Sequence, residues 1–258
     1  MTAIICISGY QLWKMSERYV QESRVKKSLL KYSPANTTAK IETGANFTAS
    51  YLPDDENSIP AEIKENQFII DLQNEVNTDI TGWLSIPGTK IDYPFVTAAD
   101  NSYYLRRDIY GNYALAGSLF MDYRCLKNFD GFNSIIYGHN MKNGSMFGEL
   151  SLFADEGFFE KNKFGTIYLK NNTYALEIFA YIVINSDDEI IYNPYVSITD
   201  AERREYFEYV KKIARNYREP QTVENAGKDM KIATLSTCLN TIGSNDIRII
   251  LLASIIDR

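Results

Sequence analysis

The chain has 258 residues, of which 45% are hydrophobic and 23% charged, so it can form one large domain with a substantial core and is not a disordered or fibrous protein. Its net charge is −6 and it has no basic stripe with interleaved aromatic residues, so we expect no nucleic-acid partner. It has a single histidine and three widely separated cysteines, which excludes a His-rich metal site and a CxxC pair and argues against a disulfide framework.

The N-terminal segment Thr2–Trp13 is mostly apolar and uncharged. It has about half of the ~20 residues that cross a bilayer, and it lacks the basic start of a signal peptide. One interpretation is the outer half of a membrane anchor that begins outside this chain, and the other is the start of a core helix. Residues 10–32 continue as a polar helix, so we expect residues 1–32 to combine an anchor remnant with an N-terminal helix.

The next two segments differ in composition and in the periodicity of their apolar residues. Residues 33–61 contain several prolines, threonines and asparagines with little periodicity, which is the composition of a linker. We expect the catalytic domain to span residues 62–258. It starts with a predicted helix, because Phe68, Leu72 and Val76 recur at spacings of four residues and form one apolar stripe.

After Gly82 the sequence consists mainly of short apolar or alternating runs separated by Gly, Asn, Asp and Pro. Such runs favour a β-barrel or a sandwich over βαβ units. The predicted strands are Trp83–Ile86, Tyr93–Val96, Gly117–Asp122, Ser134–Tyr137, Thr166–Leu169, Tyr174–Ile184, Lys231–Ser236 and Asp246–Ile255.

Two helical inserts interrupt these strands. The first is predicted over Ser145–Lys161. The second begins at Thr199, where Thr-Asp-Ala-Glu fits a capping box, and its apolar positions predict a helix of about five turns that ends at Arg218.

Cys238 ends the β-like run Ile-Ala-Thr-Leu-Ser-Thr-Cys, and a polar, turn-rich stretch then leads to a strand with Arg248 near its start. If the two strands form a hairpin, the cysteine and the arginine lie at the same end of the sheet. A guanidinium there favours the reactive thiolate and stabilises the oxyanion that forms when a thiolate attacks an amide. Taken alone, Cys238 also fits a small buried hydrophobe, as free cysteines often are.

The single histidine, His139, follows a β run and a glycine in Ser-Ile-Ile-Tyr-Gly-His-Asn. A histidine at the end of a strand suits a general acid and base, which would protonate a leaving amine and then deprotonate the incoming nucleophile. Taken alone, it equally fits a surface or capping histidine.

Together these pieces resemble the sortases. The stretches Ile-Ile-Tyr-Gly-His-Asn-Met (135–141) and Thr-Leu-Ser-Thr-Cys (234–238), followed by Arg248, are similar to the three signature pieces of that family. The stretches Asp-Asn-Ser-Tyr-Tyr-Leu (100–105) and Gly-Ser-Leu-Phe-Met-Asp-Tyr-Arg (117–124) resemble class B in particular. The long helix predicted before the cysteine strand is similar to one that class B sortases carry. The resemblance covers roughly residues 62–258.

The resemblance implies a mostly β fold, namely a closed eight-stranded barrel with N-terminal helices and one long helix between late strands. It implies a cysteine transpeptidase in which Cys238 attacks a sorting motif of a secreted surface protein and forms a thioacyl intermediate. An amine, usually from a cell-wall peptide precursor, then takes the acyl group. His139 would be the acid and base, and Arg248 would stabilise the oxyanion. No metal or cofactor is implied.

The resemblance also implies substrate-binding residues and a location. Asn101 and Leu105 match groove positions, Tyr137 matches an aromatic residue that lines the site, and Ser236 shares a strand face with Cys238. The expected location is the extracellular face of the cell membrane, held by the N-terminal anchor.

Two departures from class B keep other functions open. The loop between Cys238 and Arg248 has nine residues, which is longer than in typical members, and Ala253 is followed by Ser254 instead of a basic residue. The alternatives are a catalytically silent sortase-like binding domain and a cysteine peptidase that hydrolyses its substrate.

Overall fold

The computed structural model describes most of the segment predicted to be catalytic and part of the N-terminal helix. The expected anchor, most of the expected linker and most of the loop between Cys238 and Arg248 lie outside the described residues. The described ranges are 16–17, 19–34, 65–195, 197–220, 230–238 and 246–257.

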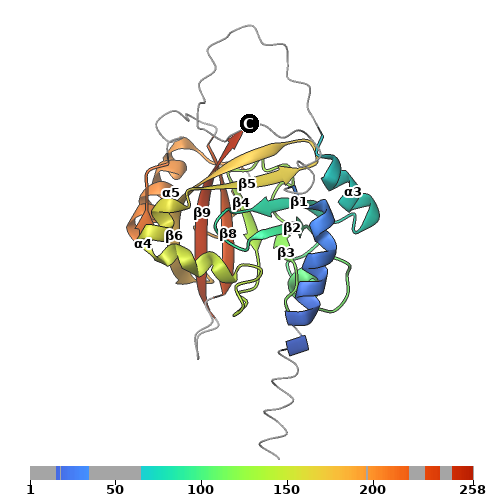
Figure 1. Cartoon of the computed structure of the whole chain (residues 1–258). Coiled ribbons are helices and arrows are strands. Elements are labelled where there is room, and N and C mark those ends of the chain that lie inside the picture. The colour runs from blue at the N-terminus through green and yellow to red at the C-terminus, as the bar shows by residue number, and fades with distance from the viewer. Residues whose placement is uncertain are drawn as a thin grey trace, which may run out of the picture.

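In the described part of the chain, nine strands form one sheet in the order β5-β1-β2-β3-β4-β8-β9-β6-β7. Strand β6 also pairs with β5, which closes eight of the strands into a barrel (Figure 1). The short β7 pairs with β6 outside this closed ring. The strands are β1 (Ile80–Ser85), β2 (Asp92–Val96), β3 (Leu119–Met121), β4 (Asn133–Tyr137), β5 (Phe164–Leu169), β6 (Thr173–Asn185), β7 (Asn216–Tyr217), β8 (Lys231–Cys238) and β9 (Ile247–Asp257).

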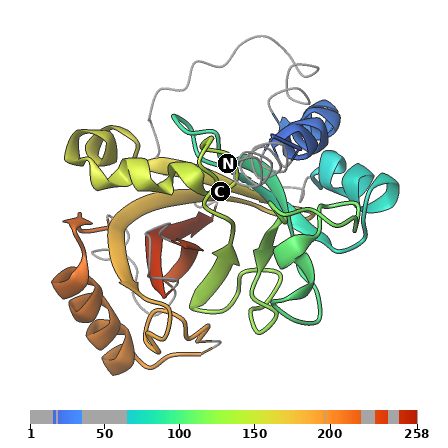
Figure 2. The ribbon, with the colours of Figure 1, turned by 90° about the horizontal axis from the view of Figure 1, so that it is seen from below.

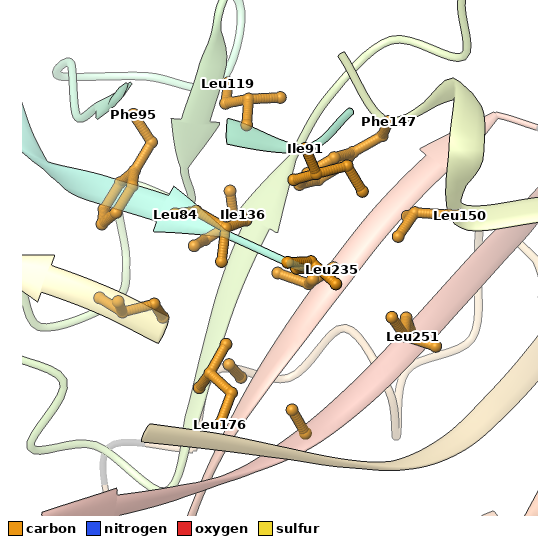
Figure 3. Packing of buried hydrophobic residues seen from close by; sticks show 14 of the residues in the cluster. Leu84, Ile91, Phe95, Leu119, Ile136, Phe147, Leu150, Leu176, Leu235 and Leu251 are labelled. Carbon is orange, nitrogen blue, oxygen red and sulfur yellow. The ribbon is translucent and has the colours of Figure 1, made fainter. Parts of the chain in front are cut away.

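The barrel is mixed, because β2–β3 and β4–β8 pair in parallel and the other neighbours are antiparallel. In β8 and β9 its central core takes alternate residues of the strand. Ala233 of β8 belongs to this core. Leu235 of β8, Leu251 of β9 and Ile136 of β4 also lie in it (Figure 3). The residues between them, such as Ile232, pack into a separate cluster on the outside of the barrel. This period of two is what alternating strands require.

Helices cover the outside of the barrel on several sides (Figure 2). Helix α3 and the helical residues 19–29 pack over one side, where Leu29, Phe68 and Leu72 are buried together. Helix α5 covers another side through Tyr206 and Val210. The helices are the 3₁₀ helices η1 (Leu30–Tyr32), η2 (Tyr103–Arg106) and η3 (Gly148–Ala154) and the α-helices α3 (Gln67–Glu75), α4 (Glu156–Lys161) and α5 (Asp200–Ile213).

The structure confirms the predicted closed barrel, and each of the eight predicted strands is present. The insert Ser145–Lys161 is helical but splits into η3 and α4. The capping box at Thr199 is also present, with reciprocal hydrogen bonds between Thr199 and Glu202.

The predicted extension of α5 to Arg218 is wrong. The helix ends at Ile213, and Ala214 already has extended backbone, with ψ of 140°. The residues that follow pair with β6, where Tyr217 faces Ala180 and Asn216 faces Tyr181. Here the open edge of β6 supplies backbone hydrogen bonds that compete with another helical turn, which a helical pattern in the sequence does not reveal.

The described N-terminal residues pack directly on the barrel. Glu22 is buried and accepts a hydrogen bond from the Tyr93 hydroxyl at 3.1 Å, and Lys26 donates to the carbonyl of Lys90 at 2.8 Å. The division into residues 1–32, 33–61 and 62–258 stays a prediction. Among the described residues, no helix combines the length and the apolar character needed to cross a membrane.

Leu251 should be important for stability because its side chain is fully buried in the central core. Leu251→Ala removes core contacts and leaves a cavity, so we expect it to lower the free energy of unfolding by about 2–5 kcal/mol. Leu152→Ala, at a side chain that is 39% exposed, is the matched control and should change the free energy by less than about 1 kcal/mol. Denaturant unfolding measures both, and equal effects would contradict this packing.

Candidate active site

Three neighbouring strands bring the predicted catalytic positions to one end of the sheet. Strand β8 pairs in parallel with β4, where Ser236 faces Tyr137, and antiparallel with β9, where Cys238 faces Arg248. The amide of Gly138 continues the β4–β8 ladder with a bond of 3.1 Å to the carbonyl of Ser236. His139 and Cys238 each follow the Tyr137–Ser236 pair by two residues. The backbone register therefore places His139, Cys238 and Arg248 together.

An open pocket of about 380 Å³ lies at this end of the barrel. Six of the seven predicted site residues line it, and the seventh, Cys238, ends the strand that carries Ser236. The structure describes the backbone of Cys238. The pocket is lined by Asn101, Leu105, Phe120, Arg124, Tyr137, Gly138, His139, Ser186, Tyr192, Ser236, Thr237 and Arg248.

His139 is held by two backbone contacts. Its Nε2 lies 2.7 Å from the carbonyl oxygen of Leu105, and its own carbonyl accepts the amide of Phe147 at 3.0 Å. A carbonyl oxygen can only accept, so Nε2 carries a proton in this arrangement.

A glycine makes this histidine contact possible. Gly117 has φ of +58°, and a Cβ added there would lie 2.6 Å from the carbonyl oxygen of Leu105 and 2.7 Å from that of Tyr104. Only glycine fits a left-handed backbone pressed this closely against other backbone atoms. Gly117 therefore sets the position of the carbonyl that holds His139.

Asp122 forms a buried acceptor beneath the pocket wall. Its side chain is fully buried, and Arg124 donates to it from Nε at 2.9 Å and from Nη2 at 2.8 Å. The side chains of Asn101 and Tyr137 also donate to it, each at 3.0 Å. Burial alone raises the pKa of Asp122, but the hydrogen bonds from Arg124 and Asn101 outweigh it and hold the pKa below its usual value. The ionised carboxylate therefore stabilises the fold at neutral pH, and this contribution is lost only as the pH falls through the lowered pKa.

Tyr192 joins the pocket from the loop after β6. Its ring stacks on Tyr137 with centroids 6.3 Å apart and an interplanar angle of 16°. Its hydroxyl lies 2.8 Å from Oγ of Ser236, and its carbonyl accepts a bond of 3.1 Å from Arg124. The loop is thus tied both to the strand of Cys238 and to the buried carboxylate.

The remaining described cysteine, Cys125, has different surroundings. Its side chain is 7% exposed, it is not among the residues that line the pocket, and burial raises the pKa of its thiol to about 11. A thiol of this kind is almost entirely protonated at neutral pH, so it is a poor nucleophile. Among the described residues, no three His, Cys, Asp or Glu side chains are grouped as a metal site would require.

Two curated proteins are similar to this chain in sequence. Sortase B of Listeria monocytogenes is 39% identical over 168 residues, which is 65% of this chain and 65% of that protein, just under two thirds of its length. Sortase B of Staphylococcus aureus is 32% identical over 183 residues, which is 70% of this chain and 72% of that protein. The chain belongs to the class B sortase family. No family model matches it.

The solved structures agree with this assignment. A Staphylococcus aureus sortase B–substrate complex superposes with a TM-score of 0.67 at 27% identity, and the match covers 75% of this chain and 86% of that one. The pocket at the end of β4, β8 and β9 therefore lies on a class B sortase fold.

Several residues of this sortase pocket were not predicted from the sequence. Asp122 and Arg124 lie within the stretch 117–124, but Asp122 bonds Asn101 and Tyr137, and Arg124 bonds the carbonyl of Tyr192, so their contacts join segments far apart in the chain. The sequence shows only an aspartate two residues before an arginine, which does not indicate these contacts. Tyr192 lies in a loop with no sequence motif that we recognised.

Gly117→Ala should disturb the histidine of this sortase. The added Cβ must push away the carbonyl of Leu105, so we expect the ring to lose its fixed Nε2–H form. The ring ¹⁵N chemical shifts measure this directly, and the chain has one histidine, so the signals need no assignment.

Gly111→Ala is the matched control, because Gly111 has a similar φ of +82° but no atom within 4 Å of an added Cβ. Its ring shifts should equal those of the unmodified protein. Identical histidine spectra in both variants would show that Gly117 does not set the histidine contact.

Proposed function

We propose that this chain is a transpeptidase that cleaves a C-terminal sorting motif of a secreted protein and joins the acyl fragment to an amine. The observation that carries the proposal is the strand register that brings His139, Cys238 and Arg248 to one end of the barrel beside an open pocket. Membership of the class B sortase family supports the same reaction.

The first half of the reaction needs a thiolate and an acid. The Cys238 thiolate attacks the carbonyl carbon of the scissile amide, and a tetrahedral oxyanion forms. The C–N bond then breaks, and the leaving amine takes a proton from Nδ1 of His139, because Nε2 is already engaged with the Leu105 carbonyl. The product is a thioacyl enzyme on Cys238 and a released C-terminal tail.

The second half reverses the proton transfer. An incoming amine gives a proton to Nδ1 of His139 and attacks the thioacyl carbon, and Cys238 leaves as a thiolate. The Cα partner of Cys238 is Arg248, which lines the pocket with a permanent positive charge. We assign to Arg248 the stabilisation of the oxyanion in both halves, an interaction whose loss typically costs about 10²–10³-fold in rate.

The pocket residues suggest how a peptide binds. Asn101 and Ser236 supply polar groups, and Leu105 and Tyr137 supply apolar surface. We assign these four residues to substrate binding. The solved complex of the Staphylococcus aureus relative with a substrate supports a peptide site on this fold.

We further propose that the enzyme acts at the extracellular face of the cell membrane. The apolar segment Thr2–Trp13 would belong to an N-terminal anchor. The partners would be a surface protein that carries the sorting motif and a cell-wall peptide precursor that supplies the amine. The reaction as written uses only side chains of this chain, so it requires no cofactor.

The test is cleavage of a panel of fluorogenic sorting-motif peptides by the full chain, with and without an added amine. We expect one peptide to be cleaved and the product to shift from acid to amide when the amine is present. Cys238→Ala should abolish turnover, because it removes the nucleophile.

Cys125→Ala is the matched control and should keep its activity, because the Cys125 thiol is buried away from the pocket. Turnover that survives Cys238→Ala would refute the proposal. Cleavage that gives only the acid, whatever amine is added, would make the protein a hydrolase instead.

A further inference from the structure

The pocket wall is built from three segments that are distant in sequence and share one buried anion. Asn101 precedes η2, Tyr137 ends β4, and Tyr192 lies in the loop after β6. Each is connected to the carboxylate of Asp122, which directly follows β3. These three connections to Asp122 do not pass through His139, Cys238 or Arg248.

Two of these connections are direct. The side chains of Asn101 and Tyr137 both donate to Oδ2 of Asp122 at 3.0 Å. The other end of the Asn101 amide accepts the backbone N–H of Tyr123 at 3.1 Å, so its orientation is fixed at both ends. Because the Tyr137 hydroxyl donates its only proton to Asp122, its oxygen can act only as an acceptor toward any other group.

The third connection runs through Arg124. Its guanidinium donates to both oxygens of Asp122 and, from Nη2, to the carbonyl of Tyr192 at 3.1 Å. Tyr192 in turn stacks on Tyr137 and contacts Ser236. Arg124 therefore links the carboxylate of Asp122 to the loop that carries Tyr192, and the Tyr192 hydroxyl contacts Ser236 on the strand of Cys238.

The burial and charge of Asp122 suit it to this function. The side chain of Asp122 is fully buried. A buried carboxylate is retained only where donors compensate its desolvation, and hydrogen bonds to an ionised acceptor are stronger than those between neutral groups. An amide in its place offers one acceptor oxygen and introduces an N–H group that faces other donors. Replacing Asp122 with asparagine therefore removes the charge and one acceptor oxygen while the volume of the side chain hardly changes.

We propose that Asp122 is the positioning residue of the substrate pocket, orienting Asn101 and Tyr137 directly and the Tyr192 loop through Arg124. This inference rests on the proposed function, because it concerns how the same pocket holds its peptide. Asp122 does not touch the reacting atoms. Its loss should weaken peptide binding and leave the reactivity of the Cys238 thiol intact.

Asp122→Asn tests this inference while nearly preserving the volume of the side chain. We expect KM for the cleaved peptide to rise about tenfold or more and kcat to change less than threefold. Alkylation of Cys238 by iodoacetamide, read by peptide mapping, should stay within twofold of the unmodified rate, because this small reagent does not need the pocket wall. A fall in kcat at constant KM, a parallel fall in alkylation, or unchanged kinetics would overturn the inference.

A double-mutant cycle shows whether Asp122 acts through its neighbours. In a Tyr137→Phe background one of its donors is already missing, so Asp122→Asn should raise KM less than it does alone. Strictly additive effects would contradict the proposed path. Asp130→Asn is the matched control, because Asp130 is exposed and pairs with Lys231 away from the pocket, and it should leave KM unchanged.

A measurement without substrate separates this inference from the proposed function. The side-chain amide of Asn101, assigned by its loss in Asn101→Asp, should give a distinct pair of ¹H–¹⁵N signals that Asp122→Asn shifts and Asp130→Asn does not. If the unmodified protein cleaves no peptide, the proposed function fails, and the Asn101 signals still decide the role of Asp122. Unshifted signals in Asp122→Asn would refute it.

Discussion

The hydrogen-bond register of β4, β8 and β9 is the constraint on which the site depends. The parallel pairing of β4 with β8 sets His139 and Cys238 at equal distances beyond the last ladder pair, and the antiparallel β8–β9 pairing brings Arg248 opposite Cys238. A slip of one residue in β8 would exchange its two faces. Ala233 and Leu235 would leave the central core, and Ser236 would enter it. Because the slip would expose apolar side chains and bury a polar one, it is unfavourable, and the register that aligns the predicted catalytic positions is kept.

The same core determines the shape of the pocket around this ladder. Gly138 separates Tyr137 from His139, and a Cβ there would lie 2.4 Å from Leu119 and 2.7 Å from Phe147. The turn into the histidine is therefore packed tightly against two core residues. On the other side of the pocket, Gly117 allows the carbonyl of Leu105 to reach the histidine ring. Two glycines and a well-packed core thus hold a single imidazole in place.

Much of the fold could be predicted from the sequence, because alternating apolar residues and turn residues mark the strands locally. The β8 run Ile-Ala-Thr-Leu-Ser-Thr-Cys shows this, since its alternate residues face the two clusters that the pattern requires. The end of α5 was missed because the edge of β6 decides it, and that edge is far away in the chain. A local sequence pattern does not show that pairing with a distant strand competes with another turn of helix.

The same distinction applies to the site. His139, Cys238 and Arg248 could be proposed from the sequence because each lies in or just after a short motif whose chemistry can be interpreted from neighbouring residues. The network around Asp122 could not be predicted, because it joins positions from 101 to 192 through side-chain hydrogen bonds. A burial pattern would not reveal it either, since a buried aspartate is an exception to the usual preference.

The proposed reaction depends on acyl transfer through a thioester on Cys238. Its most direct test is mass spectrometry of the full chain, quenched during turnover of a cleaved peptide without added amine. We expect a mass increase equal to the N-terminal acyl fragment, mapped by proteolysis to Cys238 and removed by an added amine. An adduct on Cys125 or on a residue other than cysteine, or turnover without any adduct on Cys238, would contradict it.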